Sequence, residues 1–209
     1  MFDADFQEQF LELLRWRRDV RHFSSRVVAD EDICGILRCA AFAPSVGNAQ
    51  PWRFVRLCTS AVRDALVAHV DGQSAMAAKR YAGTSRHDHY LSLKLHALRD
   101  APELLAVFCD EQPEAGNGLG IATMPEMLRY SCVMAVHNLW LAARLRGIGV
   151  GWVSILDPRE VPALLDVPAH WSLIALLCIG YPDEDSDTPE LEKRGWQARE
   201  PLEHRVFER

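Results

Sequence analysis

A long apolar segment at residues 125–146 constrains the fold of this chain more than any other stretch. Pro125 suits the first turn of a helix and Gly147 its end, so the pattern predicts one helix of about 22 residues, roughly 33 Å long. Its apolar residues lie on nearly every side: Met127, Tyr130, Val133, Met134, Val136, Trp140, Leu141 and Leu145. Such a helix must be buried on several faces, so we expect it to pack in its own core and against a second subunit, with His137 as a hydrogen-bonded core residue.

The remaining elements follow from shorter patterns. Amphipathic spacing predicts helices at residues 6–17 and 30–44, with Asp30 as the N-cap of the second. Residues 61–100 are helical in pattern but interrupted at Gly72 and Gly83. Apolar runs of strand length lie at residues 53–58, 104–109, 147–155 and 173–180. A chain of 209 residues is large enough for one sizeable core, so we expect a single domain over 1–209.

Charge and cysteine usage narrow the class of protein. A net charge of -6 argues against general nucleic-acid binding, so an anionic ligand would need a local basic pocket. The six cysteines are widely spaced and mostly lie within apolar runs, which predicts reduced, buried thiols. The first ten residues carry Asp3, Asp5 and Glu8 instead of a basic region, and no apolar run reaches the length of a membrane helix. We therefore expect a cytoplasmic protein.

One basic pocket is indicated by the run Arg17-Arg18-Asp19-Val20-Arg21, which ends the first predicted helix. Guanidinium groups pair with phosphate or carboxylate through two parallel hydrogen bonds. Asp19 lies among these arginines, and opposite charges nearby hold a carboxyl group ionised. A purely structural pairing of Asp19 with its neighbours and a functional role both remain open at this point.

Two further stretches favour a ligand site. The turn Pro44-Ser45-Val46-Gly47-Asn48-Ala49-Gln50-Pro51-Trp52 exposes side-chain amides before a strand, although a plain helix-to-strand connection gives the same pattern. The glycines of the 147–155 run let another backbone approach closely. Ser154 ends this run without a nucleophile-elbow motif, so a hydrolase serine is disfavoured.

Two segments are candidates for covering such a site. Residues 72–90 become polar around Arg86, His87 and His89, which is typical of a lid. The two histidines have no third ligand at metal-binding spacing, so we expect no metal. Residues 183–209 form a predicted C-terminal arm with aromatic and basic residues. We expect this arm to pack against the rest of the protein or against a partner chain.

Together these motifs resemble the FMN-dependent nitroreductases. The arginine run, the turn from Ser45 to Gln-Pro-Trp at residues 50–52, and the glycine-rich strand ending at Ser154 match the flavin-binding landmarks of that superfamily. Within it, the chain is most similar to the 5,6-dimethylbenzimidazole synthases, through the Arg-Arg-Asp-Val-Arg run, Asn-Leu-Trp-Leu-Ala-Ala-Arg at residues 138–144 and Gly-Val-Gly-Trp-Val-Ser at residues 149–154. The resemblance covers nearly the whole chain. It implies an α+β fold of three layers, α/β/α, around a central mixed, mainly antiparallel sheet, in a homodimer with FMN at the subunit interface.

The same resemblance implies roles for individual residues. The FMN contacts it implies are Arg17, Arg18, Asp19, Val20, Arg21, Ser45, Asn48, Gln50, Leu98, Gly151, Val153, Ser154 and Arg194. Asp19 and Ser154 are the implied catalytic pair, with Asp19 relaying protons and Ser154 forming a hydrogen bond near N5 or C4a of the flavin. No metal is implied.

The implied reaction consumes its flavin. Reduced FMN and O2 are the substrates, 5,6-dimethylbenzimidazole and erythrose 4-phosphate are the products, and a separate flavin reductase supplies the reduced FMN. Asn48 also fits the general nitroreductase turn, so an NAD(P)H-dependent nitroreductase or flavin reductase is the alternative. A non-catalytic flavin-binding protein is the third reading, and a carboxylate beside the ring disfavours it.

Overall fold

A four-stranded antiparallel sheet forms the centre of the molecule, in a computed structural model that describes residues 2–209. The strands are β1 (Trp52–Arg56), β2 (Glu103–Asp110), β3 (Gly149–Val153) and β4 (Trp171–Gly180), in the order β1-β2-β4-β3. One parallel bridge joins Asp19 to Val150 along the free edge of β3, which gives the sheet its mixed character. All four strands were predicted, with ends that differ by a few residues.

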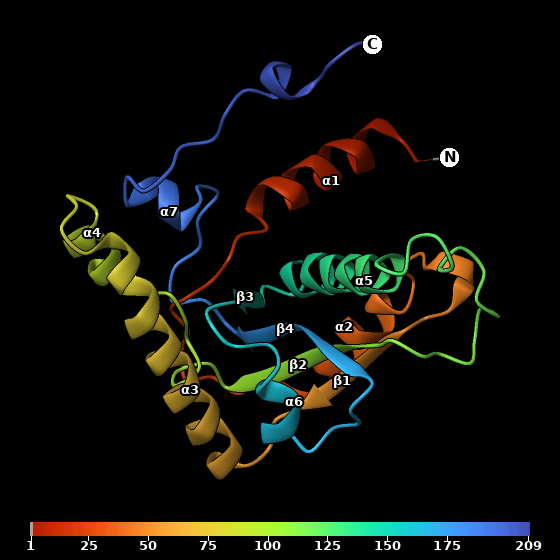
Figure 1. Ribbon diagram of the computed structural model, residues 1–209. Helices are drawn as coiled ribbons and strands as arrows, with labels where there is room; N and C mark the ends of the chain where they lie inside the picture. The colour runs from red at the N-terminus through yellow and green to blue at the C-terminus, as the bar shows by residue number, and fades with distance from the viewer. Residues whose placement is uncertain (1) are drawn as a thin grey trace.

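Helices cover both faces of this sheet (Figure 1). Alternate residues of β2 point to opposite sides: Leu105 and Val107 pack with α2 (Asp30–Ala40) and α5 (Met127–Arg144), whereas Leu104 and Phe108 pack on the side of α3 (Ser60–Ala78) and α6 (Val161–Leu164). The structure therefore has the predicted three-layer α+β architecture. Asp30 is the first residue of α2 and Ala29 is its N-cap, so the predicted capping role of Asp30 is wrong by one position.

The long helix α5 is buried on one side only within this chain. It begins at Met127, two residues after the predicted start at Pro125, and its buried residues include Leu128, Val136 and Leu139. Tyr130 and Val133 on the other side are 48% and 42% exposed. His137 shares that open face, because positions 130, 133 and 137 are spaced three and four apart, so the prediction of a core histidine is wrong.

The predicted lid region is more helical than its sequence suggests. Helix α3 passes through Gly72 without a break, because Leu66, Val67 and Val70 are buried and hold the surrounding turns in place. The second predicted break is correct: Gly83 has a φ of +76°, a conformation that favours glycine. A short 3₁₀ turn (Lys79–Tyr81) and α4 (His87–Ser92) lie on either side of it.

Both ends of the chain project from the sheet layers, as Figure 1 shows. Helix α1 (Ala4–Trp16) has no buried residue, and Phe10 and Leu11 are 44% and 60% exposed. The C-terminal segment contains α7 (Glu190–Lys193) and a 3₁₀ turn (Leu202–Arg205), beyond which Phe207 is 71% exposed. Among residues 2–209, no helix combines the length and apolar character needed to cross a membrane.

Candidate functional site

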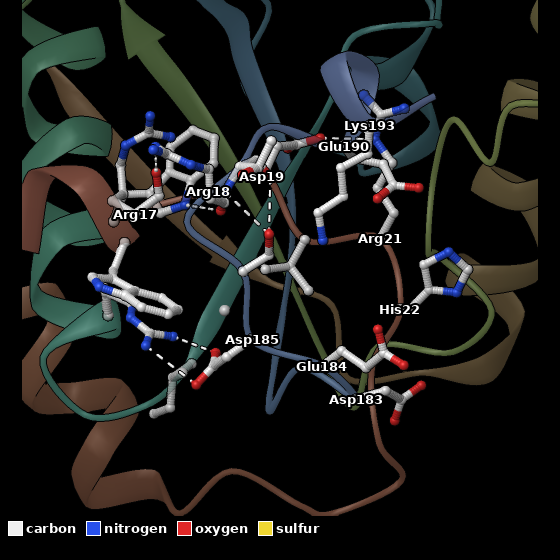
Figure 2. Close-up of a pocket in the computed structure, with 18 of the residues that line it drawn as sticks. Arg17, Arg18, Asp19, Arg21, His22, Asp183, Glu184, Asp185, Glu190 and Lys193 are labelled. Atoms are coloured by element: carbon white, nitrogen blue, oxygen red, sulfur yellow. Dashed lines mark hydrogen bonds and ion pairs between the residues drawn. The ribbon is translucent and has the colours of Figure 1, made fainter. Parts of the chain in front are cut away.

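A polar pocket of about 350 Å³ lies where the end of α1, the start of β3 and the segment 183–194 meet (Figure 2). Arg17 and Arg18 lie at one end, Glu190 and Lys193 from α7 lie at the other, and Asp19 lies between them. The predicted site residues that line it are Arg17, Arg18, Asp19, Val20, Arg21 and Arg194. Sequence analysis did not assign Trp140, Arg144, Asp185 or Glu190 to the site, and these also line the pocket.

Glycines of β3 bring the arginine run to the edge of the sheet. After α1 ends at Trp16, the backbone is extended, and Val20 N–H donates a 3.0 Å hydrogen bond to the Val150 carbonyl. A Cβ on Gly149 would lie 2.7 Å from Val20 Cγ2, and a Cβ on Gly151 would lie 2.2 Å from the Val20 carbonyl oxygen. The predicted close approach of a backbone is thus confirmed, and the approaching segment is the arginine run itself.

Both carboxylate oxygens of Asp19 are engaged. Oδ1 accepts a 2.8 Å hydrogen bond from the backbone N–H of Trp152, and Oδ2 accepts one of 2.8 Å from Nε of Arg21. Arg21 also donates from Nη1 to the Lys94 carbonyl at 2.9 Å. Asp19 and Arg21 therefore form a fixed, partly buried ion pair. This pair gives Asp19 a structural role in addition to any chemical role.

Arg17 and Arg18 are the pocket arginines left without a carboxylate, since neither forms an ion pair with any acid in residues 2–209, whereas Arg21, Arg144 and Arg194 each do. The guanidinium of Arg17 lies over the ring of Trp140, 4.9 Å from its centroid, and Arg18 donates from Nε to the Asp187 carbonyl at 2.7 Å. Burial lowers the pKa of both guanidinium groups, and the like charge of Arg199 lowers it further. A bound anion would compensate this unpaired charge, so the residues present fit a phosphate group.

Acidic residues form the opposite wall and neutralise the other two arginines. Arg144 forms a bidentate pair with Asp185, at 2.5 and 3.2 Å. Arg194 donates from Nε to Glu190 at 2.8 Å, and this hydrogen bond lowers the pKa of Glu190. Among the arginines that line the pocket, Arg17 and Arg18 are consequently the two without an acidic partner in residues 2–209.

Other predicted contacts lie outside this pocket. Ser154 is exposed immediately after β3, whereas Gly151 and Val153 are buried within the strand. Leu98 is completely buried in the core on the α3 side, and its carbonyl accepts a 2.7 Å hydrogen bond from Arg63. In this chain its side chain faces core residues and not the pocket.

The turn that carries Ser45, Asn48 and Gln50 is ordered but lies at the other end of α5. Ser45 Oγ accepts from Gln50 N–H at 3.1 Å, and Asn48 and Gln50 have positive φ values of 56° and 47°. Val46 N–H donates to Oγ of Ser131, early in α5, whereas Trp140 near its end donates to the Arg18 carbonyl. The separation of nine residues between these two contacts corresponds to about 14 Å along the helix. Within one chain, the amide turn and the arginine run are apart.

The two histidines considered as metal ligands have other partners. His87 Nδ1 lies 3.1 Å from Asp88, and His89 Nε2 lies 2.8 Å from the carbonyl oxygen of Arg194. Since a carbonyl only accepts, the ring nitrogen of His89 is the donor. His89 therefore connects α4 to the segment that lines the pocket.

Comparison with known proteins places this geometry in a family. Residues 14–181 match the family model described as the nitroreductase family. The chain is 54% identical over 201 residues to 5,6-dimethylbenzimidazole synthase of Rhodospirillum rubrum, covering 96% of this chain and 95% of the relative. It is 45% identical to a protein of the same name from Rhodobacter capsulatus, covering 97% of each.

Solved structures agree on the fold. Iodotyrosine deiodinase bound to FMN and 3-iodo-L-tyrosine superposes with a TM-score of 0.70 at 28% identity, covering 84% of this chain and 91% of that one. A BluB-like flavoprotein from Clostridium difficile superposes with a TM-score of 0.71 at 20% identity, covering 95% and 97%. The second likeness concerns the fold alone.

Proposed function

Because this chain belongs to the nitroreductase family and, within it, to the 5,6-dimethylbenzimidazole synthases, we propose that it forms 5,6-dimethylbenzimidazole by fragmenting reduced FMN with O2. Erythrose 4-phosphate is the proposed second product. The observation that carries the proposal is the presence of two arginines without an acidic partner, Arg17 and Arg18, beside an acid that is hydrogen-bonded to β3. FMN is the substrate in this proposal, and it supplies the oxygen reactivity.

The residues of this chain would bind and orient the flavin. Arg17 and Arg18 would hold the phosphate, because a dianion compensates both guanidinium groups at once. Arg21 is largely engaged with Asp19 and Lys94, so its proposed part is to hold the acid in place. The backbone from Gly151 to Ser154 would then lie beside the ring, with Asp19 holding or moving a proton and Ser154 forming a hydrogen bond to the flavin.

We propose that a homodimer completes the site. The amide turn at Ser45–Gln50 lies far along α5 from the arginine run, and α5 leaves Tyr130 and Val133 exposed. A second copy packed on that face would bring its own Ser45, Asn48 and Gln50 to the flavin held by the first. The exposed apolar residues of α1 and the C-terminal arm would be covered in the same assembly.

Three further proposals complete the account. The segment at residues 72–90 acts as a lid that keeps water and nicotinamide from the flavin. A separate reductase therefore delivers the reduced FMN. The reaction takes place in the cytoplasm, an assignment supported by six unpaired cysteines, three of them buried.

One oxygen-admission experiment tests the proposed function. The protein is loaded with FMN, reduced without oxygen and then exposed to air, while the absorbance and the organic products are followed. Irreversible loss of flavin absorbance with formation of 5,6-dimethylbenzimidazole supports the synthase. Return of oxidised FMN together with rapid NAD(P)H oxidation by a nitroaromatic would support the reductase, and return of oxidised FMN without NAD(P)H oxidation would support a flavin-binding protein.

A further inference from the structure

The side chain of Trp196 packs against the lid region, although it belongs to the C-terminal segment. Its ring makes edge contacts with Tyr81 and His89, at centroid distances of 5.6 and 5.4 Å. Arg86 lies over the same ring at 5.6 Å. Tyr90, which is buried, stacks on Tyr81 at 4.8 Å and closes the cluster. These contacts join α4 to the chain immediately after α7.

Local backbone geometry directs Trp196 into this cluster. Helix α7 ends at Lys193, Gly195 takes a φ of +69°, and Trp196 N–H donates back to the Leu191 carbonyl at 2.8 Å. Glycine adopts that conformation without steric cost, so the chain turns sharply toward α4. Gly195 and Gln197 on either side are exposed, whereas Trp196 is half-buried.

The same junction holds Arg194, which lines the pocket. His89 on α4 donates to the carbonyl of Arg194 at 2.8 Å, and the Arg194 side chain pairs with Glu190 across one turn of α7. The hydrogen bond from His89 therefore holds the backbone of Arg194 to the lid, and the pair with Glu190 orients the Arg194 side chain at the pocket wall.

We infer that Trp196 is a positioning residue, which docks the lid helix α4 against the C-terminal segment and so fixes Arg194 at the pocket wall. Closure of the lid and placement of this cation then occur together, because both depend on the same aromatic cluster. The inference rests on the proposed function only in taking FMN as the ligand of the pocket. Docking of α4 itself is independent of any ligand.

The first test measures docking without flavin. The Arg86 side chain lies over the Trp196 ring, so trypsin should cut after Arg86 faster when the lid detaches. Trp196→Ala should increase the cleavage rate at this site about tenfold, the value expected when several aromatic and cation–π contacts are lost. Trp196→Phe retains an aromatic ring and should restore most of the protection. Phe207→Ala is the matched control, since Phe207 is an exposed aromatic residue of the same arm. Equal cleavage in Trp196→Ala and the control would overturn the inference, even if the protein proved not to bind FMN.

The second test asks whether Trp196 acts through Arg194. FMN should leave Trp196→Ala about tenfold faster than wild type, yet Trp196→Ala should change the rate little when Arg194→Met is already present. Additive effects of the two substitutions on FMN release would contradict the positioning role. If Trp196→Ala folds poorly, His89→Ala gives the same comparison. His87→Ala is its control, because within residues 2–209 the His87 ring pairs with Asp88 alone. Failure of FMN to bind the wild type would count against the proposed function, whereas the protease result would still decide the docking.

Discussion

Asp19 and Trp152 are joined by a 2.8 Å hydrogen bond from the backbone N–H of Trp152 to Oδ1 of the carboxylate. This bond and the Val20–Val150 backbone bond fasten the arginine run along β3, so the cations and the strand form one rigid unit. The acid is therefore part of the framework that presents Arg17 and Arg18, in addition to any chemical role. The two contributions can be separated by substitution.

Asp19→Asn should abolish product formation while leaving FMN binding within a few-fold of wild type. The amide oxygen can still accept from Trp152, but the amide NH2 would face Nε of Arg21, which is also a donor. We expect a loss of about 1–3 kcal/mol in the free energy of unfolding from the broken charged hydrogen bond. Urea denaturation, flavin titration and product analysis measure the three effects separately.

Arg21→Met is the control for that substitution. It breaks the same ion pair but retains the carboxylate, so it should lower stability and still yield product. If Arg21→Met abolishes product as fully as Asp19→Asn, the ion pair and not the acid is required. Release of flavin from Asp19→Asn would show that the acid is structural.

Gly151→Ala should destabilise the protein by several kcal/mol and weaken FMN binding. The added methyl group would lie 2.2 Å from the Val20 carbonyl, so the arginine run would have to move away from β3. Gly72→Ala is the opposite case, because its added Cβ would meet nothing within 4 Å beyond the adjacent backbone of α3, and the site is inside that helix. That variant should gain up to about 1 kcal/mol. Urea midpoints of the two variants should therefore shift in opposite directions, and equal shifts would contradict the packing described here.

Arg17→Met should reduce the affinity for FMN about tenfold to a hundredfold and change the affinity for riboflavin by less than about twofold. The reason is that a charge-assisted hydrogen bond to the phosphate contributes about 1.5–3 kcal/mol, and riboflavin has no phosphate. Fluorescence titration with both ligands measures this difference. Arg159→Met, which affects an exposed pair with Asp157 outside the pocket, is the control. Parallel losses for FMN and riboflavin would place the phosphate elsewhere.

Stability should depend on pH through Glu190. The hydrogen bond from Arg194 lowers the pKa of Glu190 below its ordinary value of 4.5, so the folded state binds the proton less tightly than the unfolded state. The resulting stabilisation is present above pH 4.5 and is lost as the pH falls through the folded-state pKa. Wild type should consequently be more stable than Glu190→Gln at neutral pH, and the two should converge in acid. Denaturation of both proteins between pH 3 and 7 measures this difference in stability. If the difference stayed constant over that pH range, the Glu190–Arg194 pair would not be its source.

Sequence patterns predicted the strands and the glycine approach because both depend on local chemistry. The continuous apolar run at residues 104–109 fits a strand that is covered on both faces, and the glycines at 149 and 151 leave room for a neighbouring backbone. The predicted helix break at Gly72 was wrong, because the effect of a glycine on a helix depends on the distant core residues that hold α3 in place. The burial of Leu98 in the core could not be predicted from its neighbours in the sequence, because it depends on the packing of α3, β2 and the following loop.

Only some of the residues that line the pocket were predicted from the sequence. Arg17 to Arg21 formed a contiguous signal, whereas Trp140, Arg144, Asp185 and Glu190 reach the pocket from three separate segments. Arg144 and Trp140 did occur within the motif at residues 138–144, and that is the one signal that could have placed them. Nothing in the sequence around Trp196 indicates its contact with α4, because a half-buried tryptophan in a polar segment has many possible partners.

The central claim is that the flavin held by this protein is consumed, and single-turnover stoichiometry tests it most directly. FMN-loaded protein is reduced anaerobically and mixed with oxygenated buffer, and the FMN lost and the 5,6-dimethylbenzimidazole formed are both quantified. The account predicts one molecule of 5,6-dimethylbenzimidazole for each FMN lost in wild type, and full recovery of oxidised FMN in Asp19→Asn. Full recovery of oxidised FMN from the wild type, with no 5,6-dimethylbenzimidazole, would contradict it.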